Sequence, residues 1–385
     1  MPQSERHRVL FYLPWEFDLL GGVDVVVDRL VKGLRDDPEI EPLIGIQSWT
    51  QNGRHRDREG RHFLFLNAPD PGSAPLSVRS VTSLLRRLPS LALTLRRESV
   101  RTINAHFPTL NLLAFALLKR FGLWRGRLVL SFHGSDVAAL RPCAAWRLIA
   151  SQTDATTCCS AALANRLRDS GLFENCPPSV VYNGIDCERF AALGEESRGP
   201  VLSKRYLLNV GNFVPRKAQD VLISAFAKIS SRHNQLDLVL VGGSDNGVWI
   251  SELRASVQRL GLTDRVTFFE NQPQFAVAAL MRGATALIHP ARNEPFGLVL
   301  IEAAACRVPV IATRVGGIPE IISSESLGAL VEPDSPDDLA QTIETMLADP
   351  ERLHLTAERL HHHVKAQFSG DAMVAGYRTC LARKT

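Results

Sequence analysis

The stretch 289–320, HPARNEPFGLVLIEAAACRVPVIATRVGGIPE, decides the fold that we expect for this chain. Within it, the continuous apolar run 298–306 predicts a buried helix, and the run 308–312 predicts a buried strand. Glycines follow at 316–317, where the strand would turn into the next helix. This alternation of strand, loop and helix is typical of an open α/β sheet. In such sheets ligands bind beyond the carboxyl ends of the strands, where helix N-termini offer free N–H groups to phosphates.

Two glutamates, Glu294 and Glu302, stand eight positions apart in this stretch. Eight residues make a little over two helical turns, so if both residues are helical their side chains point the same way. Between them, Pro295-Phe296-Gly297-Leu298 predicts a junction from loop to helix, with proline near the helix start. The spacing alone is weak evidence, because helices contain many glutamates, and the neighbouring residues have to support it.

Length and composition favour a globular chain of two domains. At 385 residues, the chain exceeds the size at which one hydrophobic core usually keeps growing. Hydrophobic residues make up 45% of it, and no apolar run reaches the roughly 18–20 residues of a membrane-spanning helix. The first residues, MPQSERHRVLFYL, pass directly into a strand-like run, so we predict no signal peptide. Seven cysteines without CxxC spacing favour the reducing cytoplasm over a disulfide framework.

The net charge of +4 is unevenly distributed. The window 79–127 holds ten Lys and Arg residues and a single acid, Glu98. Within it, 78–100 alternates leucines with paired arginines, and Pro89 is expected to break or kink a helix there. Basic and apolar faces together are typical of a helix on an anionic membrane surface, and equally of a helix packed on its own domain with solvated arginines. Nucleic-acid binding is disfavoured, because no recognised motif accompanies the charge and aromatic residues are sparse.

Several motifs together resemble a known family. Glu294-x7-Glu302, in register with EPFG, PVIAT and GGIPE, resembles the donor-binding signature of retaining GT-B glycosyltransferases, family 4 in particular. The resemblance covers roughly residues 9–380 and is densest in 205–335. It implies an α/β fold of the GT-B type, in which two Rossmann-like doubly wound domains face each other across a cleft.

The expected domain boundaries follow from the composition and the resemblance together. Residues 1–190 are predicted to form an N-terminal, acceptor-binding domain, and the polar, unpatterned stretch 191–204 a linker. Residues 205–360 repeat the alternation of strands and helices and are predicted to bind the nucleotide-sugar donor. The resemblance implies that the C-terminal helices, 361–385, cross back to the N-terminal domain.

Two candidate sites lie in the N-terminal half. Gly21-Gly22 separates a predicted strand from a predicted helix, where glycine lets backbone N–H groups approach an anion closely, although a plain turn explains the pair equally well. The resemblance implies that this loop faces the donor diphosphate and the acceptor. His133 follows the predicted strand 128–132, and HGSD resembles the family's His-Gly-x-Asp, whose histidine approaches the donor sugar.

In the C-terminal half, Arg216 and Lys217 lie in a predicted strand-to-helix loop, where a cation can meet a bound phosphate. Two departures from the family occur here. Gly211-Asn212 stands where Gly-Arg is common, and Ala218 follows the lysine where glycine is usual. Arg216 is expected to replace part of the missing charge, although the sequence does not show the direction of its side chain.

The expected chemistry is metal-independent. The sequence contains no Asp-x-Asp, so the leaving diphosphate has to be stabilised by Lys217, by Arg216 and by the free N–H groups at Phe296, Gly297 and Leu298. We expect Glu294 to bind sugar hydroxyls and Glu302 to accept hydrogen bonds from the ribose hydroxyls. No metal or other cofactor is expected. Three adjacent histidines, His361, His362 and His363, would point in three directions on a helix, so they could not all bind one metal ion. We expect them to lie on a solvated face of the helix.

The resemblance therefore predicts a retaining glycosyltransferase that moves a sugar from a nucleotide-diphosphate sugar to a hydroxyl of a glycan, a lipid-linked or a small-molecule acceptor, as in polysaccharide biosynthesis. Two alternatives stay open: a nucleotide-sugar epimerase or hydrolase of the same fold, and a non-catalytic partner subunit. The expected location is the cytoplasm, with peripheral contact to the inner face of an anionic membrane through 79–127 as one possibility.

Overall fold

The computed structural model of the chain describes residues 6–17, 21–48, 53–57, 60–66, 78–194, 204–243 and 247–382. Its contacts divide the chain into two compact units, which consist of Met1–Tyr182 with Gly370–Thr385, and of Asn183–Ser369. This division falls between Tyr182 and Asn183, before the expected linker 191–204, of which residues 195–203 lie outside the described part of the chain. Helix α7 (Cys187–Leu193) packs against α10 (Gln274–Gly283) and α11 (Leu298–Ala305) of the second unit.

The first unit is built on an eight-stranded sheet in the order β3-β4-β2-β1-β5-β6-β7-β8. Its strands β1, β2 and β6 contain long apolar runs, because helices cover both faces of a parallel sheet. In β1, for example, the five residues from Val9 to Leu13 are almost completely buried. The strands are β1 (His7–Leu13), β2 (Ile40–Gln47), β3 (Gly53–Arg56), β4 (His62–Leu66), β5 (Val100–His106), β6 (Arg127–Phe132), β7 (Ala155–Cys158) and β8 (Ser179–Val180).

The helices of the first unit are α1 (Gly22–Gly33), α2 (Val78–Arg97), α3 (Leu113–Arg120), α4 (Ser135–Ala139), α5 (Ala144–Gln152), α6 (Ala161–Arg168) and α15 (Gly370–Leu381), with a 3-10 turn at Leu110–Leu112. The polar stretch RHRDREGR at 54–61 has no strand pattern in the sequence, yet its first residues belong to strand β3. It pairs antiparallel with β4, and all four of its residues are exposed. A strand with no buried side lacks the alternating pattern by which strands are recognised.

Helix α2 carries the basic and apolar segment discussed above. Its leucines at 84, 88, 91 and 95 are buried, and the helix contacts α3 and β5 of its own unit. Leu85 and Leu93 remain about half exposed. Pro89 lies inside the helix, which continues through it as a single element. In the described part of the chain, no helix is long and apolar enough to cross a membrane.

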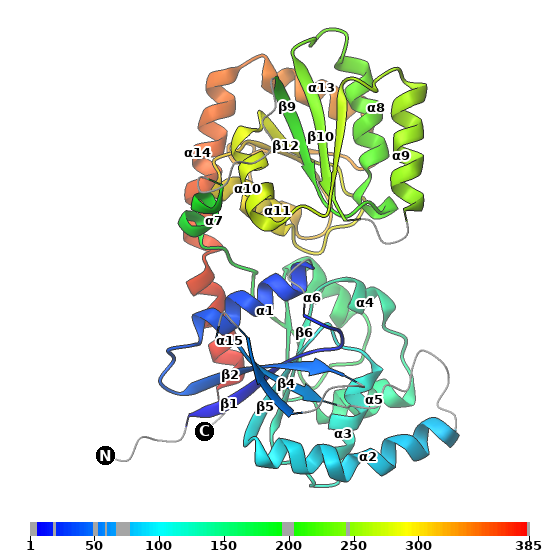
Figure 1. Ribbon diagram of the computed structural model, residues 1–385, viewed down its shortest axis with the longest axis vertical. Coiled ribbons are helices and arrows are strands. Elements are labelled where there is room, and N and C mark those ends of the chain that lie inside the picture. The colour runs from blue at the N-terminus through cyan, green and yellow to red at the C-terminus, as the bar shows by residue number, and fades with distance from the viewer. Residues whose placement is uncertain are drawn as a thin grey trace. The chain divides into compact units, whose positions relative to one another are not determined.

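Helix α15 returns the end of the chain to the first unit. Its buried residues Met373, Tyr377 and Leu381 are four positions apart and form one face, and the helix packs against α1. Figure 1 shows α15, in red, beside α1, in blue. Residues 361–369, which were expected to cross back as well, belong to the second unit.

The second unit is built on a six-stranded sheet in the order β11-β10-β9-β12-β13-β14, and its described pairings are all parallel. Numbered within the unit, this is the order 3-2-1-4-5-6 of a doubly wound Rossmann fold. The strand order reverses between β9 and β12, so the ligand crevice of such a fold lies beyond their carboxyl ends. The strands are β9 (Arg205–Val210), β10 (Leu236–Gly242), β11 (Val266–Glu270), β12 (Ala286–His289), β13 (Val310–Thr313) and β14 (Ala329–Val331).

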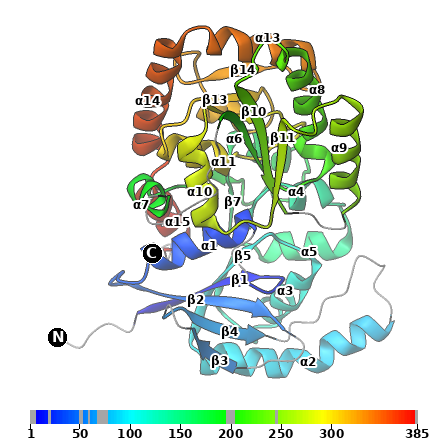
Figure 2. The ribbon, with the colours of Figure 1, turned by 45° about the horizontal axis from the view of Figure 1, so that its top comes forward.

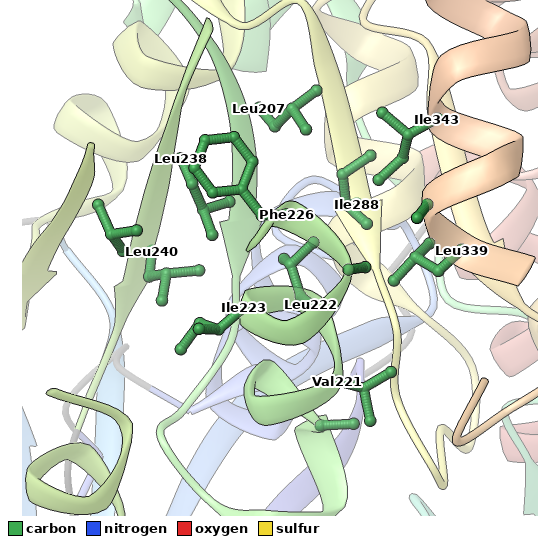
Figure 3. Packing of buried hydrophobic residues seen from close by; sticks show 14 of the residues in the cluster. Leu207, Val221, Leu222, Ile223, Phe226, Leu238, Leu240, Ile288, Leu339 and Ile343 are labelled. Carbon is green, nitrogen blue, oxygen red and sulfur yellow. The ribbon is translucent and has the colours of Figure 1, made fainter. Parts of the chain in front are cut away.

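Helices cover the two faces of this sheet (Figure 2). On one side, Phe226 and Leu222 of α8 pack against Leu238 of β10 and Ile288 of β12, with Ile343 of α13 beside them (Figure 3). These five side chains are fully buried, which anchors the strands that carry the loops of the site. The remaining helices are α8 (Gln219–Ile229), α9 (Val248–Arg259), α12 (Ile318–Ile321), α13 (Pro336–Leu347) and α14 (Pro350–Gln367), with a 3-10 turn at Pro215–Lys217.

Candidate functional site

The loops after β9 and β12 bring together two of the residues that the sequence singled out. Because these strands are parallel neighbours, the loops at their carboxyl ends lie side by side. Lys217 Nζ lies 2.6 Å from Glu294 Oε2, and both side chains are largely buried, with exposed fractions of 14% and 10%. His289, the last residue of β12, places Nε2 at 2.9 Å from the same oxygen. The switch point therefore holds a buried cluster of one carboxylate, one ammonium and one imidazole.

The electrostatics of the cluster keep Glu294 ionised. Burial alone would raise the pKa of its carboxyl group, but the Lys217 ammonium and the hydrogen bond from His289 outweigh burial and hold the pKa well below its ordinary value. Burial lowers the pKa of His289 in spite of the hydrogen bond to Glu294. At neutral pH the cluster therefore contains an ionised Glu294 carboxylate and a neutral His289 imidazole.

Arg292 holds the two loops against each other. Its backbone N–H donates to the carbonyl of Arg216 at 2.9 Å, and its Nη1 donates to the carbonyl of Pro215 at 2.6 Å. The guanidinium also binds Asp220 through two nitrogens, at 2.7 and 3.0 Å, and Asp334 through Nε at 2.6 Å. The hydrogen bond to Asp220 is the main cause of the raised pKa of Arg292. This clamp fixes the turn that carries Lys217.

The paired glycines of the motif hold the backbone of Glu294. Gly316 has φ +53°, and a Cβ at this position would lie 1.9 Å from the carbonyl oxygen of Glu294. The next residue, Gly317, donates its N–H to that oxygen at 3.1 Å. Only glycine fits such an approach, because any side chain would displace one of the two backbones. The turn after β13 thus positions the carboxylate that follows β12.

The structure corrects the helical argument for the two glutamates. Glu294 lies in the loop, and α11 begins at Leu298, so the spacing of eight does not place both residues on one helical face. Glu302 is half-buried in the second turn of α11. Phe296 turns its side chain into the core, where it packs edge-on against Phe368, and Gly297 enters the helix with φ +106°. Phe296 and Gly297 are buried, and Leu298, the first residue of α11, is half-buried.

The positions that depart from the family pattern lie around Lys217. Asn212 and Arg216 are exposed. Gly211 lies under the lysine, since a Cβ on it would contact the Lys217 side chain at 3.6 Å. Ala218 is buried and adopts the left-handed conformation, with φ +54°. This backbone explains why glycine is usual there, and it means that the alanine is held in a strained conformation by the surrounding loop.

His133 of the first unit follows β6, and Asp136 shapes its turn. The Asp136 carboxylate accepts hydrogen bonds from the backbone N–H groups of His133, Gly134 and Val137, at 2.9, 2.6 and 2.9 Å. Burial nevertheless raises the pKa of Asp136 to about 6. Gly134 has φ +141°, which favours glycine at the second position of the motif. Burial lowers the pKa of His133 to about 4, so the imidazole is neutral at pH 7.

Gly21 and Gly22 are exposed at the start of α1, where Gly21 is the N-cap residue without a side-chain cap. They and His133 belong to the first unit, whereas the other predicted site residues belong to the second. The histidine run is solvated only in part, since His362 is exposed and His363 half-buried, and the expectation is wrong for His361. His361 is buried and binds the carbonyl of Ala304 through Nδ1 at 2.9 Å. Across the described ranges, no group of three or more His, Cys, Asp and Glu residues could hold a metal ion.

The sequence analysis did not identify two residues as functional, namely His289 of the cluster and Arg292, which clamps the two loops. Both lie in the quoted motif as part of His-Pro-Ala-Arg, so their proximity to Glu294 in the sequence was the available signal. Their roles depend on side-chain direction across the two loops, which the sequence pattern does not contain.

Comparison with known proteins agrees with this architecture. Residues 20–189 match the family described as Glycosyltransferase Family 4, and residues 195–362 match the family described as Glycosyl transferases group 1. The chain is 30% identical to the N-acetyl-alpha-D-glucosaminyl L-malate synthase of Bacillus anthracis over 74% of this chain and 75% of the relative. It is 34% identical to the D-inositol 3-phosphate glycosyltransferase of Segniliparus rotundus, over 52% of this chain and 47% of the relative. The chain thus spans about half the length of this second relative.

Among solved structures, the Anabaena protein Alr3699/HepE in complex with UDP and glucose matches with a TM-score of 0.76 at 21% identity, over 98% of this chain and 99% of that one. The chain therefore has the GT-B fold, and it belongs to the group 1, or family 4, glycosyltransferases.

Proposed function

We propose that this chain is a retaining, metal-independent glycosyltransferase that uses a nucleotide-diphosphate sugar as donor. The observation that carries the proposal is the buried cluster of Lys217, Glu294 and His289 at the switch point of a Rossmann-like unit. A transferase of this kind has to bind sugar hydroxyls and stabilise a departing diphosphate. The cluster supplies an ionised carboxylate for the first task and a cation for the second.

The roles follow from the charges and positions. Glu294, with its low pKa, accepts hydrogen bonds from hydroxyls of the transferred sugar, and its carboxylate is oriented by His289. Lys217 moves from Glu294 to the diphosphate when the donor binds. The backbone N–H groups at Phe296, Gly297 and Leu298 lie at the N-terminal end of α11, which begins at Leu298, and provide a second anion site.

Further residues complete the proposed site. Glu302 accepts hydrogen bonds from the ribose hydroxyls, as carboxylates do in dinucleotide sites. Gly211, Asn212 and Arg216 border the diphosphate. His133 and the Gly21-Gly22 turn serve the same reaction from the first unit.

A UDP-sugar is the first donor to test, because the matching Anabaena structure contains UDP and glucose. For the acceptor, the names of the relatives include malate and an inositol phosphate, which are small hydroxyl compounds. We propose a hydroxyl of a small molecule, a glycan or a lipid-linked saccharide as acceptor. Thermal unfolding in the presence of UDP-, GDP- and ADP-sugars ranks the donors, since a bound ligand raises the stability of the folded state.

Variants of the cluster test the function. We expect Lys217→Ala and Glu294→Gln each to lower kcat/KM for the donor by at least about tenfold. Lys228→Ala is a matched control, because Lys228 forms an exposed ion pair with Asp337 in the same unit. Unchanged kinetics in both cluster variants would remove them from the reaction. Turnover without any acceptor would identify a hydrolase or epimerase instead.

The stereochemistry and the metal requirement need separate measurements. NMR of the first product formed reports whether the anomeric configuration of the transferred sugar is retained. Full activity after exhaustive treatment with EDTA is the outcome expected for a metal-independent enzyme. A strict requirement for an added divalent cation would contradict the role assigned to Lys217.

We also propose that the exposed side of α2 contacts an anionic membrane. Leu85 and Leu93 are about half exposed, and Arg86, Arg96 and Arg97 lie exposed on the same helix. Most of the apolar face is used for packing within the unit, so only weak, salt-sensitive binding is expected. Sedimentation with phosphatidylglycerol vesicles should be reduced in Leu85→Ser/Leu93→Ser and unchanged in Leu260→Ser, an equally exposed leucine of the second unit.

A further inference from the structure

A second histidine, His106, lies directly behind His133 at the carboxyl end of β5. Its side chain is fully buried. His106 Nδ1 lies 2.9 Å from His133 Nε2, and His106 Nε2 lies 3.0 Å from Asn104 Oδ1. The two imidazole rings are stacked, with centroids 5.1 Å apart and planes inclined by 23°. His106 therefore connects the half-buried His133 to polar groups inside the sheet.

The orientation of the Asn104 amide decides which ring nitrogens carry hydrogen. Asn104 Nδ2 lies 2.8 Å from Ser131 Oγ and 3.4 Å from the carbonyl oxygen of Val129. A backbone carbonyl can only accept, so the NH₂ group of the amide must face it. The amide oxygen then faces His106, and the Nε2 of His106 must carry the hydrogen that it accepts.

The tautomer of His133 follows from that of His106. Burial and the neighbouring His133 lower the pKa of His106 well below its ordinary value, so its ring is neutral. A neutral ring with hydrogen on Nε2 has a lone pair on Nδ1, and this lone pair accepts from His133 Nε2–H. The remaining nitrogen of His133, Nδ1, is then an acceptor. In the described parts of the chain, it has no hydrogen-bond partner.

Helix α15 holds His106 in place from the other side. The Tyr377 ring stacks on His106, with centroids 5.7 Å apart and planes inclined by 24°. The Tyr377 hydroxyl hydrogen-bonds to the side chains of Ser131 and Thr157, which are themselves joined at 2.8 Å. Figure 1 shows α15 within the first unit, to which β5 and β6 also belong. The ring of His106 is thus fixed by stacking and by hydrogen bonds at both nitrogens.

We infer that His106 is a positioning residue that holds His133 in its Nε2–H tautomer, so that His133 offers Nδ1 as an acceptor to a hydroxyl group of the bound sugar. An ionised phosphate has no hydrogen to donate, so this nitrogen selects a hydroxyl over a phosphate oxygen. The inference rests on the proposed function only in naming the ligand as a sugar.

Three variants of His106 separate positioning from packing. In His106→Asn, the side-chain amide oxygen is two bonds from Cβ, as Nδ1 is in histidine. It can therefore still accept the hydrogen bond from His133 Nε2–H. In His106→Gln, the amide nitrogen takes the place of Nε2 and preserves only the bond to Asn104. In His106→Phe, the stacked ring stays, and both hydrogen bonds are lost. Circular dichroism and thermal unfolding establish that each variant is folded.

The tautomer is measured directly by long-range ¹H–¹⁵N correlation of the histidine side chains, with His133→Gln used to assign the signals of His133. We expect the Nε2–H tautomer in the wild type and in His106→Asn, and a mixture of tautomers in His106→Gln and His106→Phe. Turnover should fall about tenfold in the last two variants, in line with one lost hydrogen bond at a buried group, and less than about threefold in His106→Asn.

Several results would overturn the inference. One is an Nδ1–H tautomer of His133 in the wild type, and another is an unchanged tautomer in His106→Phe. A packing role predicts that His106→Phe is more active than His106→Asn, because it keeps the stacked ring. The tautomer is measured without donor or acceptor, so the two proposals can fail separately. If the wild type shows the expected tautomer but His133→Gln keeps full turnover, His133 has no role in transfer. The positioning of His133 by His106 would then still stand.

Discussion

Replacing Glu294 and Lys217, singly and together, tests whether their contact is a buried ion pair that is coupled in solution. The two charged atoms are 2.6 Å apart, and the Lys217 and Glu294 side chains are exposed by only 14% and 10%, respectively. Removing one partner of a buried pair costs about 3–5 kcal/mol, because the other charge stays buried without compensation. We take the lower end, about 3 kcal/mol, for Glu294→Gln and for Lys217→Met, since the lysine keeps some access to water.

The double variant should lose much less than the sum of the single variants. Gln and Met are neutral and similar in size to the residues they replace, and His289 can still donate to the glutamine oxygen. We expect the double variant also to lose about 3 kcal/mol, so the coupling energy is about 3 kcal/mol. The exposed pair Lys228 and Asp337, at 2.8 Å, is the control, and its coupling should stay below about 1 kcal/mol.

The measurement is urea unfolding of the second unit, followed by hydrogen exchange of peptides from 204–369. With a slope of about 3 kcal/mol per M, each single variant should lower the urea midpoint by about 1 M. The double variant should lower it by about 1 M as well. Midpoint shifts that add up in the double variant would refute the reasoning, because they would mean that Lys217 and Glu294 do not interact in solution.

Three further predictions follow from the same contacts. Gly316→Ala should abolish activity and lower the free energy of unfolding of the second unit by at least about 3 kcal/mol, because the new Cβ would collide with the Glu294 carbonyl. Gly261→Ala is the control, since Gly261 has a similar positive φ but no atoms near its Cβ position, and it should cost only about 1–2 kcal/mol. Urea unfolding measures both values. Arg292→Lys keeps the positive charge but loses the two-nitrogen contact with Asp220, so it should raise the KM for the donor at least about fivefold. An unchanged KM would show that the loop carrying Lys217 does not depend on this contact. Because burial lowers the pKa of His133 to about 4, the unfolded chain binds a proton below pH 6.5 that the folded chain does not, and stability falls as the pH is lowered from 6.5 to 4. The stability of wild type relative to His133→Gln, from urea unfolding at several pH values, should therefore fall by about 1.4 kcal/mol per pH unit in this window, and a constant difference would contradict it.

Much of the fold was predictable because its strands and helices are local and strongly patterned. The buried strands β1, β6 and β9 contain apolar runs, and a glycine follows within two residues of the end of β6 and of β9. The motif around Glu294 was recognisable for the same reason. Its glycines at 316–317 are required by one backbone approach, so the requirement is written into residue type.

Other features could not be predicted, since their causes lie in distant parts of the chain. Strand β3 has no buried side and exists only through its pairing with β4. The arginine-rich helix α2 was ambiguous until its leucines were placed against α3 and β5. The unit boundary at Tyr182 follows from the packing of α7, which the polarity of 191–204 does not reveal.

By itself, the sequence determined the class of fold and most of the order of strands and helices, and its resemblance to a known family pointed to Lys217, Glu294 and His133 as candidate site residues. Period, glycine placement and residue type are local properties that any stretch displays on its own. Only the tertiary structure decided that His289 and Lys217 meet at one oxygen of Glu294, and that His106 lies between His133 and Asn104. Hydrogen bonds at these distances depend on how separate strands align in a sheet, and that alignment is fixed only when the whole core packs together.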